Sequence, residues 1–154
     1  MGSSEYLGQS QPAKANAGNR IAAFLIDAAV VFLLAFVPFV GFVLGLAYCL
    51  IRDGMEFGFM DRRSIGKQAM KLRPISLEGA PMDGILSIKR NWPCALGGLS
   101  VLFLSNWVVW IAGVTMIGIA ILVALVETAL IFVDKQGRRI GDYTARTQVI
   151  ESNT

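Results

Sequence analysis

Two carboxylates and one guanidinium lie within or beside strongly apolar parts of the chain: Asp27, Glu127 and Arg20. An ionisable side chain in an apolar helix usually faces a bundle interior or a water-filled cavity, which makes it a candidate functional group. Arg20 and Asp27 are seven residues apart, so a helix places both on one face, about 10 Å apart along its axis. If the helices of Asp27 and Glu127 pack together, the two carboxylates can share a proton, because each raises the pKa of the other.

This pair would suit a carrier of protons or monovalent cations. The alternative is that Arg20 extends to the membrane interface and that a local partner neutralises Asp27. A third acid, Asp142, follows two arginines in the segment 138–142 (RRIGD). Asp142 could pair with Arg20 and complete a group of one arginine and two aspartates. The alternative for this segment is a solvated run of charges.

The segment Ser64-Ile65-Gly66-Lys67 is a further polar motif. A nucleotide-binding P-loop needs the pattern GxxxxGK[ST], and Asp61 stands where its first glycine would be. We therefore predict a structural role for the motif. Gly66 would permit a tight turn, and Lys67 would reach lipid phosphates or the last carbonyls of a helix.

The composition argues against an enzyme. Histidine is absent, which removes the commonest general base and metal ligand, and there is no GxSxG motif or metal-ligand cluster. We predict no metal and no cofactor. Cys49 and Cys94 lie in apolar runs without CxxC spacing, so we interpret them as small packing residues. The net charge of +3 is better explained by anionic lipid headgroups than by nucleic acid.

Two long stretches without charge, 28–51 and 91–126, predict an integral membrane protein. About 20 helical residues cross roughly 30 Å of hydrocarbon, so these stretches can supply four spans, at about 20–37, 41–57, 92–112 and 114–133. Pro38 divides the first pair, and Gly113 divides the second beyond the interfacial Trp107 and Trp110. We predict an all-α membrane protein with two helical hairpins. Three spans, with the first stretch as one tilted helix, are the alternative.

All fourteen Lys and Arg residues lie outside the two stretches, and the hairpin topology puts all of them on one side of the membrane. Since cytoplasmic loops collect Lys and Arg, both termini and the basic segment 58–91 are predicted to be cytoplasmic. Within that segment we expect a short helix in 60–73, a strand at 72–77 that leads into a Glu-Gly turn as a possible β-hairpin, and a short helix capped by Asp83. Residues 1–18 and 151–154 are predicted tails, and 147–150 a possible strand.

Three segments, in this order, resemble the signatures of the RDD family of bacterial integral membrane proteins, which is named for one arginine and two aspartates. The segment 19–27 (NRIAAFLID) matches the opening of the family, with Arg20 at the start of the first helix and Asp27 within it. The segments 64–73 (SIGKQAMKLR) and 138–149 (RRIGDYTARTQV) match the other two signatures, which makes Asp142 the second aspartate. The resemblance covers about residues 19–150.

The resemblance implies a bacterial inner-membrane protein and, as suggested for some members, transport of ions or small ligands. The chain departs from the family in its short loop after the first helix and in Pro74, where members run on in β-branched residues. From the resemblance and the carboxylates in apolar parts of the chain together, we predict transport of protons, monovalent cations or a small ligand. The alternative is an accessory or assembly subunit of a larger membrane complex. Small residues around Gly97 favour a homo-oligomer or a membrane partner.

Overall fold

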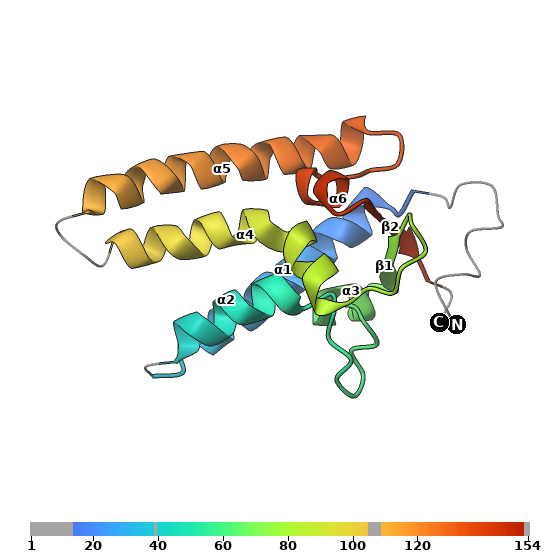
Figure 1. Ribbon diagram of the computed structural model, residues 1–154, viewed down its shortest axis with the longest axis horizontal. Helices are drawn as coiled ribbons and strands as arrows, with labels where there is room; N and C mark the ends of the chain where they lie inside the picture. Colours follow the sequence, from blue (N-terminus) through green and yellow to red (C-terminus); the bar gives the residue numbers. More distant parts are fainter. Residues whose placement is uncertain (1–13, 39, 105–108, 153–154) are drawn as a thin grey trace.

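The computed structural model describes residues 14–38, 40–104 and 109–152. The chain is mostly helical, with two antiparallel helix pairs and one two-stranded sheet (Figure 1). The elements are α1 (Ala17–Ala35), α2 (Gly41–Ile51), α3 (Ile65–Ala69), β1 (Leu72–Ser76), α4 (Gly84–Leu104), α5 (Trp110–Val133), α6 (Ile140–Thr144) and β2 (Thr147–Glu151). Helix α2 packs on α1 and α4, and α5 packs on α4. The C-terminal ends of α1 and α4 and the N-terminal ends of α2 and α5 lie at one end of the molecule, and the sheet lies at the other.

The first helix pair agrees with the predicted hairpin, although its second helix is shorter than predicted. The Asn16 side chain caps α1 by accepting a hydrogen bond from the Gly18 N–H at 2.8 Å. Helix α1 ends at Ala35, before Pro38, and α2 begins at Gly41. The prediction extended α2 to residue 57, but the helix ends at Ile51, because the next residues turn to make polar contacts with α4.

The predicted break at Gly113 is wrong. Helix α4 ends at Leu104, and Gly113 lies in the first turn of α5. A stretch without charge carries no local signal for its turn, and a glycine alone does not mark the position of the turn. Trp107 lies outside the described residues, and Trp110 is the first residue of α5. Helix α4 also begins earlier than predicted, at Gly84, because the short helix expected after Asp83 continues into the membrane-type segment.

Pro93 lies inside α4 and leaves one carbonyl of this helix free to contact α6. Proline has no N–H, so the carbonyl of Lys89, four residues earlier, loses its helical donor. The Thr144 hydroxyl donates a hydrogen bond to that carbonyl at 2.9 Å. Gly141 approaches the same turn so closely that an added Cβ would lie 1.8 Å from the Arg90 carbonyl oxygen. The free Lys89 carbonyl and the close approach at Gly141 therefore hold α6 against α4.

The sheet joins distant parts of the chain. Strands β1 and β2 are antiparallel, with Leu72 opposite Glu151 and Ser76 opposite Thr147. Both strands were expected, but the local β-hairpin at the Glu-Gly turn is wrong, because β1 pairs with the C-terminal strand. The short helix expected in 60–73 covers only α3. Leu72 and Val149 are buried together with Ala15 and Ala23 of the N-terminal region.

The ordered fold extends beyond the predicted domain limits at both ends. Ala15 is fully buried, and Lys14 donates hydrogen bonds to the carbonyls of Phe132 and Asp134 at 3.2 and 3.0 Å. At the C-terminus, Glu151 belongs to β2. The remaining parts of the two predicted tails, 1–13 and 153–154, lie outside the described residues.

Two described helices, α1 and α5, are long and apolar enough to cross a membrane, and α2 is a shorter apolar helix. Only 17% of the apolar window of α1 and 6% of that of α5 is buried. Large apolar side chains therefore face outward, for example Leu33 at 67% and Leu125 at 63% exposure. A helix in the core of a soluble protein would bury most of this surface.

The docking of α6 is testable with a matched pair of glycine substitutions. Gly141→Ala should lower the free energy of unfolding by about 2 kcal/mol, because the methyl group would clash with the backbone of α4. Gly118→Ala, in α5, meets no atom within 4 Å and should be neutral or stabilising by up to about 1 kcal/mol. Denaturation of both detergent-solubilised variants would show this difference, and equal effects would contradict the packing.

Candidate functional site

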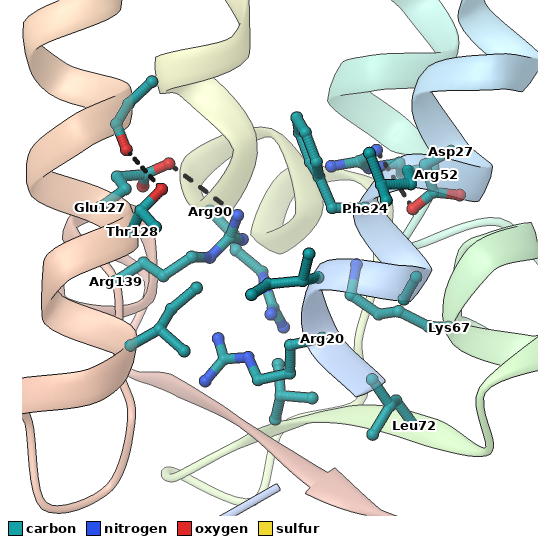
Figure 2. A pocket seen from close by; sticks show the side chains of 16 residues that line it. Arg20, Phe24, Asp27, Arg52, Lys67, Leu72, Arg90, Glu127, Thr128 and Arg139 are labelled. Carbon is teal, nitrogen blue, oxygen red and sulfur yellow. Dashed lines mark hydrogen bonds and ion pairs between the residues drawn. The ribbon is translucent and has the colours of Figure 1, made fainter. Parts of the chain in front are cut away.

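Charged side chains form a buried polar layer where the helices meet α3, α6 and the sheet (Figure 2). Recorded ion pairs, together with hydrogen bonds through Ser64, connect nine of these residues. We call these nine the charge network: Arg20, Asp27, Arg52, Asp53, Lys67, Arg90, Glu127, Arg139 and Asp142. Five are cations and four are carboxylates, so one positive charge is uncompensated.

Asp27 is 1% exposed and is held by four groups. The hydroxyls of Tyr48 and Ser64 donate hydrogen bonds to it at 2.8 and 2.7 Å. The Gly66 N–H donates a third at 2.8 Å, and the Arg52 guanidinium lies 3.2 Å away. This carboxylate is fully occupied by partners, as the alternative interpretation of the sequence expected.

The Ser64–Lys67 motif supplies two of the hydrogen bonds to Asp27, from the Ser64 hydroxyl and the Gly66 N–H. We call the four groups around this carboxylate the Asp27 cradle. Ser64 is the N-cap of α3, and in the first turn the Gly66 N–H donates to the Asp27 carboxylate, while the Lys67 N–H donates to the Ser64 hydroxyl. Gly66 is required for close approach, because an added Cβ would lie 1.9 Å from the Ala23 carbonyl oxygen of α1. Gly66 lies within helix α3, so the predicted tight turn at this residue is wrong. The motif fastens α3 to α1.

Lys67 is buried, and its ammonium contacts a carboxylate instead of the helix carbonyls that were predicted. Its ammonium lies 2.6 Å from the Asp53 carboxylate, which is also 3.4 Å from Arg90 Nε and accepts a hydrogen bond from the Asn91 amide at 3.3 Å. Burial lowers the pKa of Lys67 from 10.5 to about 8, and the attraction of Asp53 offsets only part of this effect.

Asp142 is fully buried among three guanidinium groups. They belong to Arg90 at 3.0 Å, Arg20 at 3.3 Å and Arg139 at 3.5 Å. The proposed Arg20–Asp142 pair is therefore present, whereas Asp27 pairs with Arg52 instead. Burial alone would raise the pKa of Asp142, but the three cations outweigh it and lower the pKa from 3.8 to about 2.

Glu127 and Asp27 have separate partners. Glu127 accepts a hydrogen bond from the Gly141 N–H at 3.3 Å and lies 3.9 Å from Arg139. Because each carboxylate has its own arginine, the geometry gives no support to a proton shared between the two. Within the described ranges, no group of three or more His, Cys, Asp or Glu side chains could hold a metal ion.

A cavity of about 330 Å³ lies between α1 and α5, beside the charge network. Its charged lining consists of Arg20, Asp27, Arg52, Lys67, Arg90, Glu127 and Arg139. In Figure 2, the guanidinium groups of Arg20, Arg90 and Arg139 converge on the space between the two helices. Most of the other lining residues are apolar, so the cavity has a cationic floor and apolar sides.

Arg90 has unused hydrogen-bonding capacity in this floor. Its side chain is 0% exposed, and its Nε contacts Asp53 and Asp142. Within the described part of the chain, none of its three guanidinium nitrogens has a hydrogen-bond partner, and Nη1 and Nη2 together carry four N–H bonds. A buried guanidinium with four unpaired N–H bonds is a strong donor set for a negatively charged oxygen. The site can therefore bind an anion.

Sequence reasoning missed several members of the site: Tyr48, Arg52, Asp53, Arg90 and Arg139. A signal for three of them is present in the sequence. Arg52 and Asp53 directly follow the first charge-free stretch, and Arg90 directly precedes the second. The charged residues that border the two charge-free stretches would lie at the same end of the molecule, and so meet, if the two hairpins pack side by side in the same direction. Tyr48 carried no such signal, because it lies within an apolar helix.

No family model matches the chain, and neither the curated proteins nor the solved structures contain a detectable match.

The Asp27 cradle can be tested by removing its charge. Asp27→Asn should lower the free energy of unfolding by about 3 kcal/mol or more, because Arg52 would remain buried without a counter-charge. Glu78→Gln is the control, since this carboxylate is 58% exposed and its partner Arg146 is 74% exposed, so its loss should cost about 1 kcal/mol or less. Chemical denaturation in detergent measures both, and similar losses would contradict the assignment.

The Asp142 site makes stability depend on acid pH. A carboxylate whose pKa is lowered by folding stabilises the fold above its unfolded pKa, and this contribution is lost as the pH falls through the folded value. For a change from 3.8 to about 2, the loss is about 2 kcal/mol and occurs between about pH 4 and pH 2.

Thermal unfolding of detergent-solubilised wild type and Asp142→Asn across this range provides the measurement. The two proteins should become more alike in stability as the pH approaches 2. A difference that stays constant over the whole range would contradict the ion-paired state of Asp142.

Proposed function

We propose that the chain is a multi-pass membrane protein of the bacterial inner membrane, with four spans and both termini in the cytoplasm. Two long apolar helices with exposed side chains support this topology. In Figure 1, the ends where α1 passes to α2 and α4 to α5 lie opposite the sheet and α6, and basic residues flank β1 and α6 in the sequence, as expected if Lys and Arg stay on the cytoplasmic side.

The length of α2 needs a physical explanation under this proposal. Eleven helical residues rise only about 16 Å, about half the hydrocarbon thickness. Non-helical backbone is tolerated at membrane depth only where protein buries it. The residues after α2 meet this condition, since Arg52 is 4% and Asp53 0% exposed.

Within this topology, we propose that the protein binds a small anionic ligand in the cavity between α1 and α5 and thereby takes part in ligand transport. The observation that carries the proposal is the Arg90 guanidinium, whose nitrogens have no hydrogen-bond partner among the described residues and which lines a cavity with five cations and two carboxylates in its lining. Transport of protons or monovalent cations past Asp27 and Glu127 has less support, because each carboxylate already has an arginine partner.

Membership of the RDD family is part of this proposal. It is supported by the position of the three signature residues, Arg20, Asp27 and Asp142, which are all buried in the charge network. An accessory subunit of a larger complex is the alternative function. The exposed apolar faces of α5 would suit a membrane partner or a second copy of the chain as well as they suit lipid.

The topology predicts the location of reporter fusions. Fusions after Val40 and Val109, in the two interhelical turns, should report the periplasmic side. Fusions after Ser64 and after Ser152 should report the cytoplasm, because basic segments surround both points. A cytoplasmic signal from either turn would exclude four spans.

The anion site predicts ligand-dependent stabilisation of the purified protein. Inorganic phosphate should raise the thermal midpoint of the wild type, whereas sodium or potassium added as chloride at equal ionic strength should not. Arg90→Lys keeps the positive charge but loses the guanidinium fork, and it should weaken phosphate binding about tenfold or more. Arg146→Lys, whose side chain is 74% exposed, is the control and should leave binding unchanged.

A further inference from the structure

The residues that bound the cavity are buried on one side and exposed on the other. On the side of the sheet, it is bounded by Leu72 and Val149, which are 1% and 2% exposed. Between the helices, it is bounded by Phe24 and Leu25 of α1, which are 56% and 60% exposed, and by Ala124 of α5, which is also exposed. A ligand would therefore enter between two apolar helix faces.

The floor of the cavity and its entrance differ in chemistry. The floor carries the converging guanidinium groups of Arg20, Arg90 and Arg139 (Figure 2). The entrance carries apolar side chains of α1 and α5, the two helices that are long enough to span a membrane. A ligand complementary to both regions has a negatively charged head and an apolar tail.

The charge balance limits the head to about one negative charge. The charge network holds five cations against four carboxylates, so a single anionic group would neutralise it. A phosphodiester offers two oxygens to the unpaired nitrogens of Arg90 and has this charge. The volume of about 330 Å³ would hold the head and the first carbons of a chain, while the rest would lie along the helix faces.

We propose that the ligand of this cavity is an anionic phospholipid, with its phosphodiester at Arg90 and its acyl chain between α1 and α5. This inference rests on the proposed anion site and adds the class and the entry route of the ligand. The protein takes this lipid from the bilayer through the gap beside Phe24 and Ala124.

The experiment measures lipid binding to the full chain purified in a neutral detergent, with phosphatidylglycerol, phosphatidylcholine and inorganic phosphate as probes. Phosphatidylglycerol should bind at least about tenfold more tightly than either of the others, because only it offers both the net charge and the chain. Arg90→Lys should reduce this binding.

Two tryptophan substitutions on α5 test the entry route without touching the charge network. Ala124→Trp fills the entrance and should weaken phosphatidylglycerol binding about tenfold or more. Ala129→Trp makes the same change at an exposed position of the same helix outside the cavity lining and should leave binding within about twofold.

The possible outcomes separate the two proposals. If phosphatidylcholine binds as tightly as phosphatidylglycerol, or if Ala124→Trp and Ala129→Trp behave alike, the lipid inference is overturned. If inorganic phosphate binds as tightly as phosphatidylglycerol, the ligand is a soluble anion, and the proposed function stands without the lipid. If no anionic probe binds, both proposals fail. Because the tryptophan variants leave the network intact, this test remains valid even if Arg90→Lys does not fold.

Discussion

The burial of the Arg90 guanidinium is the constraint on which the structure depends. Removing such a group from water costs several kcal/mol, and two carboxylates, Asp53 and Asp142, offset part of that cost at 3.4 and 3.0 Å. Asp53 follows α2, Arg90 lies on α4 and Asp142 lies in α6. One side chain therefore ties both helix pairs to the C-terminal segment. In the proposed membrane setting such a tie is needed, because lipid is as apolar as the helices and hydrophobicity alone does not hold them together.

Close backbone approach at two places allows this polar layer to form. Gly66 lets α3 contact α1, which brings its own N–H to Asp27, and Gly141 lets α6 contact α4, which places Asp142 beside Arg90. Pro93 contributes to the second contact by freeing a carbonyl that the Thr144 hydroxyl then uses. The layer thus depends on small residues and one proline as much as on the charges themselves.

The sequence predicted what depends on composition and charge, and it failed where long-range contacts decide. The two helix pairs follow from charge-free length, and the contact of Arg20 with Asp142 follows from placing the basic segments together. The turn at Gly113 was wrong, because an apolar stretch without charge has no local marker for its turn. The pairing of β1 with β2 was missed, because residues separated by more than 70 positions leave no local signal of their register. The role of Arg90 was missed for the same reason, since its partners come from two other segments.

The incomplete pairing of Arg90 is the strongest physical reason to regard the layer as more than a structural joint. A purely structural network gains stability by satisfying every buried donor, and a buried polar group without a partner costs about 1–3 kcal/mol. Here Arg90 lines a cavity, and although its Nε lies within ion-pair distance of two carboxylates, none of its three guanidinium nitrogens has a hydrogen-bond partner among the described residues. Water could satisfy them in part, but the excess of one cation over the carboxylates would remain in a region of low dielectric constant, where an unbalanced charge is most costly. An anionic oxygen removes both costs at once. The same feature that weakens the empty fold therefore supplies binding energy for a negatively charged ligand.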